Sequence, residues 1–140
     1  MNTHKDDRGW SWWDVFPLRG GLVNQVNLSW MHPGAIKGIH AHLRQSDFWF
    51  CAAGCILVVT CEARKASAEP DGDALKRRVL YPGDPAIKIP PGVWHGCRAI
   101  GGEKALLVYG VTEQYDPSDP DEIRLPWDSF GADVWEMQPK

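Results

Sequence analysis

The sequence has no long hydrophobic run, no excess of basic residues and no paired-cysteine motif. No apolar stretch in its 140 residues approaches the length of a membrane span, and residues 1–10 lack the apolar core of a secretory signal. We therefore expect a cytoplasmic protein with no membrane partner. The formal net charge of −3 provides no basic surface for nucleic acid, so we expect no nucleic-acid partner.

The cysteines occur without CxxC spacing, which argues against a zinc knuckle and against a disulfide framework. All of them lie inside apolar runs of strand length: Cys51, Cys55, Cys61 and Cys97. We expect them to be reduced residues of the core.

Glycine and proline are frequent and scattered through the chain. The 14 Gly and 11 Pro separate short apolar runs, and little of the sequence has helical periodicity. This pattern predicts one all-β domain over residues 1–140, with roughly ten short strands arranged as a sandwich or barrel.

The expected strands are separated by turn residues and lie at 8–16, 22–30, 35–42, 47–53, 56–62, 79–81, 86–89, 94–100 and 104–111. The turns at 82–84 and 101–102 predict that the last four strands form two hairpins. We expect residues 1–7 to be frayed, residues 65–76 to form a surface loop and residues 116–140 to wrap back over the barrel.

The central segment brings three histidines and a carboxylate within reach of one another. His40 and His42 share one face of a strand because successive side chains alternate. Asp47 follows after a short polar turn, and His95 follows a Pro-Pro-Gly turn far downstream. Such a set is a standard one for a divalent metal, so we predict that it binds one ion of Zn, Fe, Ni or Mn. The alternative is that the histidines only form hydrogen bonds in a polar cavity.

The same spacing is typical of cupins, whose β-jelly roll receives histidines from two separated strands. HxH, four residues, Asp, six residues and Gly at 40–54, with PxGxxH at 90–95, resemble the two cupin motifs. Six segments resemble, more narrowly and in order, the dTDP-4-dehydrorhamnose 3,5-epimerase family: D-x-R-G-W at 6–10, Q-x-N-x-S at 25–29, G-A-I-K-G-I-H at 34–40, I-P-P-G-V-W-H-G at 89–96, V-Y-G-V-T-E-Q-Y-D-P at 108–117 and D-E-I-R-L-P-W-D at 121–128.

This resemblance implies a cupin β-jelly roll and a sugar-nucleotide epimerase or isomerase that acts on a 4-keto-6-deoxyhexose nucleotide. It places His40 at the catalytic base, Tyr109 at the catalytic acid and His95 at a second active-site histidine. The positions that it implies for contacts with the nucleotide-sugar substrate are Arg8, Gln25, Asn27, Lys37 and Tyr115. The resemblance also implies a homodimer in which Arg8 serves the neighbouring subunit's site, and the aromatic run WSWW at 10–13 has the character of an edge strand buried by a second copy.

Three departures from the family pattern affect the chemistry. Asp47 stands where the family has lysine, Lys37 stands where it has arginine, and the aspartate that pairs with its base has no counterpart in residues 1–140. HAH is similar instead to sugar-nucleotide 3,4-ketoisomerases. HxH with a carboxylate four residues later is similar to the zinc-containing cupin domain of a capsular-polysaccharide UDP-sugar epimerase.

These departures leave alternatives open. If His40 is a metal ligand, it has no lone pair left to act as a free base, so its two roles exclude each other. The chain is then an epimerase or isomerase, a metal-dependent cupin of another class such as a dioxygenase or small-molecule isomerase, or a non-catalytic sugar-nucleotide-binding cupin. Gln25, Asn27 and Lys37 have a solvated strand face as their alternative, and Tyr109 a place in the apolar core.

Overall fold

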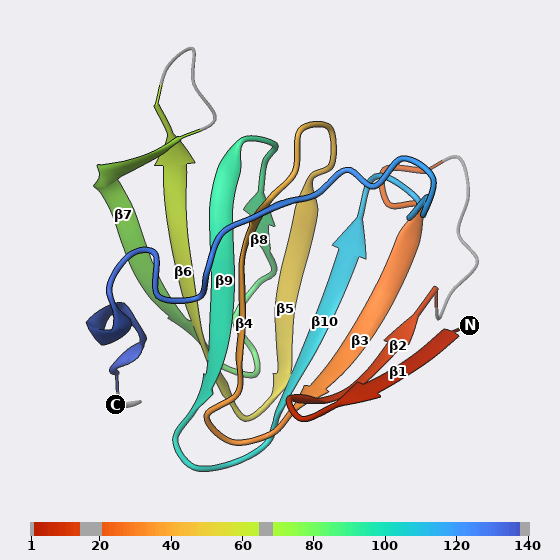
Figure 1. Cartoon of the computed structure of the whole chain (residues 1–140). Coiled ribbons are helices and arrows are strands. Elements are labelled where there is room, and N and C mark those ends of the chain that lie inside the picture. The colour runs from red at the N-terminus through yellow and green to blue at the C-terminus, as the bar shows by residue number, and fades with distance from the viewer. Residues whose placement is uncertain (1, 15–20, 65–68, 138–140) are drawn as a thin grey trace.

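The structure consists of two antiparallel β-sheets that face each other. It is a computed structural model that describes residues 2–14, 21–64 and 69–137 (Figure 1). Sheet A has the strand order β1-β2-β3-β10-β5-β8, with β1 (Asn2–Asp6), β2 (Gly9–Trp13), β3 (Gln25–Met31), β5 (Asp47–Ala53), β8 (Ile87–Ile89) and β10 (Ala105–Val111). Sheet B has the order β11-β4-β9-β6-β7, with β4 (Ile36–Ala41), β6 (Cys55–Ala63), β7 (Pro70–Leu80), β9 (Val93–Ile100) and β11 (Ile123–Arg124). The expected all-β cupin jelly roll is confirmed.

The main core fills the space between the sheets at one end. Its buried side chains come from both sheets and include Met31, Trp49, Ile56, Val58 and Leu107. Along β3 every second residue is buried, so one face of this strand points between the sheets. At the other end the inward side chains become polar, and there the sheets enclose a cavity instead of a core.

Sheet B is buried on its outer face as well. Residues 123–137 lie along it and end in the 3₁₀ helix η1 (Ala132–Trp135). Trp135 is 1% exposed, and its indole N–H donates to the carbonyl of Trp127 at 2.8 Å. Because β6 is covered on both faces, its sequence CILVVTCEA is a nearly continuous apolar run, unlike a strand with one solvated face.

The chain start is more ordered than we expected. Residues 1–7 were expected to be frayed, but β1 pairs with β2 along its whole length, from Asn2 opposite Trp13 to Asp6 opposite Gly9. The guanidinium of Arg8 binds the Asp6 carboxylate in the connecting turn. The aromatic strand expected at 8–16 is β2 within the described residues; its positions 15 and 16 lie outside them.

Both predicted hairpins are wrong. β7 pairs with β6 in sheet B, whereas β8 pairs with β5 in sheet A. In the same way β9 pairs with β4 and β6, whereas β10 pairs with β3 and β5. The turns were correctly placed, but they carry the chain from one sheet to the other. Local turn residues do not distinguish a hairpin from such a crossover, because the choice depends on which strands bury apolar faces together.

The surface loop expected at 65–76 is also wrong from residue 70 on. β7 begins there and pairs with β6, from Pro70 opposite Ala63 to Leu80 opposite Ile56. Residues 65–68 lie outside the described part. The cysteines are free thiols. Three of them are buried as expected, but Cys55 is partly exposed, so the expected core position is wrong for it. In the part of the chain that the structure describes, no helix has the length and apolar character needed to cross a bilayer.

Candidate active site

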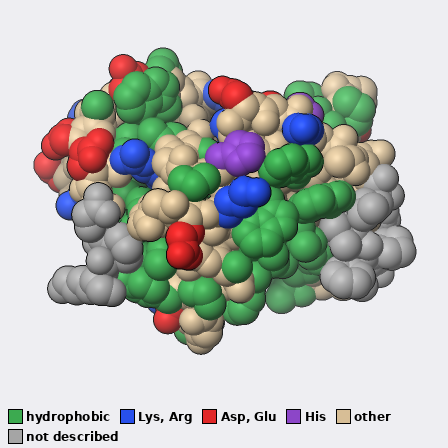
Figure 2. All heavy atoms as spheres, turned by 90° about the horizontal axis from the view of Figure 1, so that it is seen from below, with side chains coloured by type: hydrophobic (Ala, Val, Ile, Leu, Met, Phe, Trp, Pro, Cys, Tyr) green, Lys and Arg blue, Asp and Glu red, His purple; other side chains and the backbone are tan. Residues whose placement is uncertain are grey.

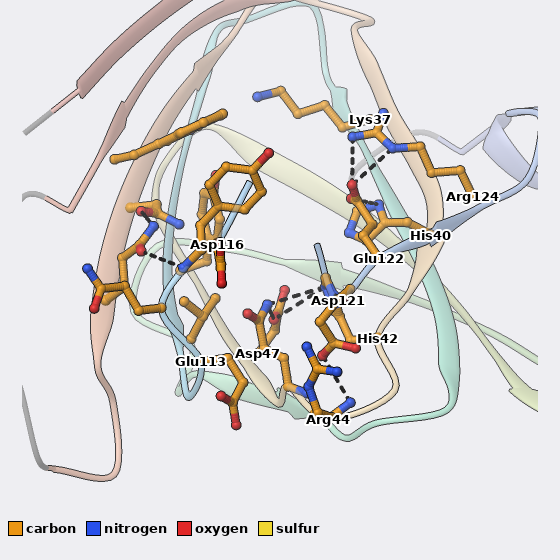
Figure 3. Close-up of a pocket in the computed structure, with 18 of the residues that line it drawn as sticks. Lys37, His40, His42, Arg44, Asp47, Glu113, Asp116, Asp121, Glu122 and Arg124 are labelled. Carbon is orange, nitrogen blue, oxygen red and sulfur yellow. Dashed lines mark hydrogen bonds and ion pairs between the residues drawn. The ribbon is translucent and has the colours of Figure 1, made fainter. Parts of the chain in front are cut away.

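The cavity between the sheets has a volume of about 450 Å³ and gathers nearly all the predicted site residues. Its lining includes Arg8, Gln25, Asn27, Lys37, His40, His42, Asp47, Tyr109 and Tyr115, together with acidic residues of the segment 113–122. His95 is buried beside this lining, with its ring centroid 4.3 Å from that of His40. Figure 3 shows His40 and His42 on one side of the cavity, Glu113 and Asp116 on the other, and Asp47 between them.

Two glycines allow the histidine strands to approach. β4 and β9 pair so that His40 lies opposite His95. A Cβ on Gly38 would lie 2.7 Å from the Cα of Gly96, and a Cβ on Gly96 would lie 2.8 Å from the carbonyl oxygen of Lys37. Real Cβ atoms are not found so close to backbone atoms, so this pairing requires glycine at both positions.

His40, His42, Asp47 and His95 form one cluster, in which one ligand atom of each residue lies within 4.8 Å of the others. The Nδ1 atom of His42 lies 2.5 Å from the carbonyl oxygen of Asp121, and that of His95 lies 2.8 Å from the carbonyl oxygen of Val93. A carbonyl oxygen only accepts, so both Nδ1 atoms carry the proton. In the uncharged form of each imidazole the lone pair is therefore on Nε2.

Asp47 is the buried carboxylate of the cluster. Gln45 donates to one of its oxygens at 2.6 Å, and the indole of Trp49 donates to the other at 3.0 Å. Burial raises the pKa of Asp47, but the interactions with His95 and His42 outweigh it, and the pKa is lowered overall. Asp47 is therefore a buried anion at neutral pH.

The cluster fits a divalent cation. The Nε2 atom of His95 is buried and has no hydrogen-bond partner, and its distance of 3.7 Å to Asp47 is beyond hydrogen-bond range. The Nε2 atom of His42 lies 3.7 Å from the other oxygen of Asp47. Imidazole lone pairs around a carboxylate, with Nδ1 held by carbonyl groups, are the donor set and the outer hydrogen bonds of many protein metal sites.

The same environment controls the protonation of His40 and Tyr109. Burial, together with the repulsion that a protonated His40 would meet from His95 and His42, lowers the pKa of His40 well below its usual value. Burial and the charge of Asp47 raise the pKa of Tyr109. At neutral pH His40 is therefore an unprotonated imidazole and Tyr109 a protonated phenol.

The polar residues of β3 face the cavity and not solvent. Gln25 and Asn27 are 5% and 6% exposed, and the Gln25 amide donates to the Asn27 oxygen at 2.9 Å. The backbone N–H of Tyr115 donates to the Gln25 oxygen at 3.2 Å. The ring of Tyr115, 56% exposed, lies 6.0 Å from that of Trp13 in an edge-on arrangement. The solvated-face alternative is thus wrong for Gln25 and Asn27. Through its bond with Tyr115, Gln25 also holds the residue whose ring packs against Trp13.

Lys37 and Arg8 bring positive charge to the cavity. The Lys37 ammonium donates to the hydroxyls of Ser29 and, at 3.2 Å, Ser11, and burial lowers its pKa. The solvated-face alternative is therefore wrong for Lys37 too. Arg8 lines the cavity of its own chain, and the role in a neighbouring subunit that the resemblance implied stays a prediction.

Sequence reasoning missed three residues that contact the cluster. Gln45 lies between His42 and Asp47, with its amide nitrogen 3.3 Å from the His42 Nε2 atom. Asp121 accepts from His42, and Glu122 lies 4.0 Å from the Nδ1 atom of His40. The D-E-I-R motif contained the last two, but nothing local showed that it would pair with β4.

The family model for dTDP-4-dehydrorhamnose 3,5-epimerase matches residues 1–138. The chain belongs to this family. Membership makes it an epimerase or isomerase enzyme, and it disfavours both the oxygenase and the non-catalytic alternatives.

Relatives agree with this assignment. The spore coat polysaccharide biosynthesis protein SpsL of Bacillus subtilis is 36% identical over 136 residues, which cover 91% of this chain and 85% of SpsL. The probable low-salt glycan biosynthesis epimerase Agl13 of Haloferax volcanii is 38% identical over 102 residues, 71% of this chain and 64% of Agl13. Among solved structures, the capsular polysaccharide assembling protein CapF of Staphylococcus aureus has a TM-score of 0.73 at 22% identity, over 89% of this chain and 31% of CapF. The likeness to CapF shows the fold alone.

Proposed function

We propose that this protein epimerises or isomerises a nucleotide-linked 4-keto-6-deoxyhexose by removing a proton from a carbon beside the ketone. The observation that carries the proposal is the pairing, in one cavity, of an imidazole kept neutral and a phenol kept protonated. Such a reaction needs a base for the acidified C–H and an acid that returns a proton on the other face. His40 fills the first role and Tyr109 the second.

The charges of the cavity suit the two ends of such a substrate. Arg8 and Lys37 attract a diphosphate, Gln25 and Asn27 offer amides to sugar hydroxyls, and Tyr115 offers an aromatic face to the nucleotide base. When His40 takes a proton, the cluster gains a positive charge, which the Asp47 carboxylate stabilises.

The test is solvent exchange. The protein is incubated in D2O with a panel of dTDP-, UDP- and GDP-4-keto sugars, and deuterium at carbons beside the ketone is followed by NMR. We expect uptake with at least one substrate, a loss of about 10²- to 10⁴-fold in His40→Asn, and a comparable loss in Tyr109→Phe. No exchange and no turnover across the whole panel would refute the function.

A metal-assisted form of the same reaction is the second candidate, favoured by the unpartnered Nε2 atom of His95. The negative charge of Asp47 disfavours an enolate by between ~1 and ~4 kcal/mol at 4 Å, depending on the effective dielectric constant. A divalent ion held by His40, His42, Asp47 and His95 would reverse this effect and polarise the ketone. In that form His40 is a ligand, and a different group takes the proton.

Metal content separates the two forms. Protein purified without a histidine tag is analysed by plasma mass spectrometry beside His42→Ala. Near one equivalent of Zn, Fe, Ni or Mn that disappears in the variant, with activity lost on chelation, supports the metal-assisted form. Full activity in protein without metal supports His40 as the base.

We also propose a homodimer that forms through the outer face of sheet A. Eight large apolar side chains project from four neighbouring strands on this face: Trp10, Trp12, Val26, Leu28, Trp30, Phe48, Phe50 and Val108. None is fully buried, and Phe50 is 37% exposed. Figure 1 places β1, β2 and β3 on the right. In Figure 2, which keeps the same right side, many apolar side chains lie toward that side. A broad flat patch is self-complementary about a two-fold axis, which suits a second copy of the chain.

The WSWW run was expected to be an edge strand that a second copy buries. In the structure β1 covers the edge of β2, and Trp10 and Trp12 instead contribute to the proposed interface through the face of the sheet. A cytoplasmic location is proposed as well, because free thiols persist in a reducing compartment.

A further inference from the structure

Two consecutive residues of the C-terminal segment lie against the two histidines of the HxH pair. β11 pairs antiparallel with β4, and Arg124 lies opposite His40. The carbonyl oxygen of Asp121 is 2.5 Å from the Nδ1 atom of His42, and the Oε1 atom of Glu122 is 4.0 Å from the Nδ1 atom of His40. The first contact is a hydrogen bond. The second is beyond hydrogen-bond range, so Glu122 acts on His40 through the negative charge that it places beside Nδ1.

Glu122 is itself held in place. Arg124 donates to its Oε2 atom through Nε at 3.0 Å and Nη2 at 2.8 Å, which leaves Oε1 on the side of His40. Figure 3 shows Glu122 between Arg124 and His40. A carboxylate fixed in this way by a guanidinium costs little further entropy when it orients an imidazole.

Asp121 holds the turn that follows His42. Its carboxylate accepts backbone N–H groups of Leu43 at 2.9 Å, Arg44 at 2.9 Å and Gln45 at 2.8 Å. Because this turn positions the side chain of Gln45 between His42 and Asp47, the carboxylate and the carbonyl of Asp121 act on the same part of the cluster.

We propose that Asp121 and Glu122 are positioning residues that hold His42 and His40 as their Nδ1–H tautomers, so that both Nε2 lone pairs face the cavity. A neutral imidazole has one proton and two nitrogens, and the partner of one nitrogen decides which of them keeps the lone pair. For His40 this inference rests on the proposed function, because a lone pair on Nε2 is what removes the substrate proton. The same tautomer serves a metal ligand, so the proposal holds for either form of the enzyme.

The tautomers are measured directly by long-range ¹H–¹⁵N NMR of histidine-labelled full-length protein, together with turnover of the best substrate of the keto-sugar panel. In the wild type we expect both histidines to carry the proton on Nδ1. In Glu122→Ala we expect His40 to lose this preference and kcat to fall by about 10- to 100-fold, with KM changed less than about twofold. Glu122→Gln keeps the size of the side chain but removes its charge, so we expect it to behave like Glu122→Ala.

Asp121→Asn tests the second residue. The backbone carbonyl that accepts from His42 remains, but the side chain keeps one acceptor oxygen in place of the two that hold the turn at 43–45. We expect the carbonyl to be held less firmly against His42 and the His42 tautomer to become mixed; the thermal midpoint is monitored alongside. The control is Glu136→Gln, which removes an exposed ion pair with Arg98 outside the cavity lining and should change neither tautomer nor rate.

Nε2–H histidines in the wild type, or unchanged tautomers in both Glu122→Ala and Asp121→Asn, would overturn the proposal. Because the NMR measurement needs no substrate, tautomers that shift as expected in a protein without turnover would refute the proposed reaction and leave the positioning role intact. Should Asp121→Asn fail to fold, the two Glu122 variants decide.

Discussion

At the scale of single residues, Lys37 is a half-buried cation whose partners are hydroxyl groups. Ser11 and Ser29 accept from its ammonium, and neither neutralises its charge. A phosphate oxygen of the substrate would supply that missing charge. We expect Lys37→Met to weaken binding of a nucleoside diphosphate about 10- to 100-fold, the loss of a hydrogen bond to a charged group of roughly 1.5 to 3 kcal/mol.

Titration calorimetry with dTDP, UDP and GDP measures this loss. Lys104→Met is the matched control, because Lys104 is exposed and lies over the ring of Trp10, outside the cavity lining. Equal affinity in Lys37→Met and the wild type would remove Lys37 from the substrate site.

The buried thiol of Cys97 leads to a second prediction at this scale, on how the stability of the protein depends on pH. Burial raises the pKa of its thiol to about 12, whereas an unfolded cysteine titrates near about 8.5. The folded state therefore keeps a proton that the unfolded state releases, so stability is full below pH ~8.5 and is lost as the pH rises toward the folded pKa. Between pH 8.5 and 10 we expect the unfolding free energy to fall by up to ~2 kcal/mol through Cys97 alone.

Urea unfolding across this range checks the slope. Cys97→Ala should be less stable at pH 7 because a side chain of the core is truncated, but its stability should fall less steeply with pH. Cys55→Ala, at a partly exposed position, serves for comparison. The same slope in Cys97→Ala and the wild type would contradict the prediction.

At the scale of elements, the pair of β4 and β9 is the critical one, because it brings the histidines together. A Cβ on Gly96 would lie 2.8 Å from the Lys37 carbonyl and 2.9 Å from the ring of Trp135. We expect Gly96→Ala to destabilise the protein by about 1 to 3 kcal/mol through overpacking, and to shift the emission of Trp135.

Chemical denaturation followed by tryptophan fluorescence measures both effects. Gly72→Ala is the control, since a Cβ there meets nothing within 4 Å. If Gly96→Ala were as stable as this control, the close approach of the two strands would be wrong.

At the scale of the whole molecule, the two sheets differ in what covers them. The outer face of sheet B is buried by residues 123–137, whereas the outer face of sheet A carries a broad apolar patch with no such cover within the described residues. We expect a dimer at micromolar concentration, and a monomer in Leu28→Lys, because Leu28 lies at the centre of the patch between Trp12 and Val108.

Light scattering after size-exclusion chromatography gives the mass directly. Leu22→Lys places the same charge at a position that is 74% exposed and should leave the dimer intact. A monomeric wild type, or a dimeric Leu28→Lys, would reject this face as the interface.

Much of the fold and of the cluster was predictable because it depends on local spacing. Alternation along a strand places His40 and His42 on one side whatever the rest of the chain does, and the unbroken apolar run of β6 indicates burial on both faces. The scattered Gly and Pro residues placed most turns correctly. Each of these features requires only neighbours in the sequence.

The tertiary structure alone decided which strands pair and what surrounds the histidines. The turns at 82–84 and 101–102 are compatible with hairpins, yet the chain crosses between sheets there, because burial of apolar faces is a non-local choice. Asp121 and Glu122 are about 80 residues from the histidines that they contact, 79 in the case of His42. A separation of this length in the sequence does not determine whether two residues meet in space. The pairing of β11 with β4 brings Asp121 and Glu122 to the site.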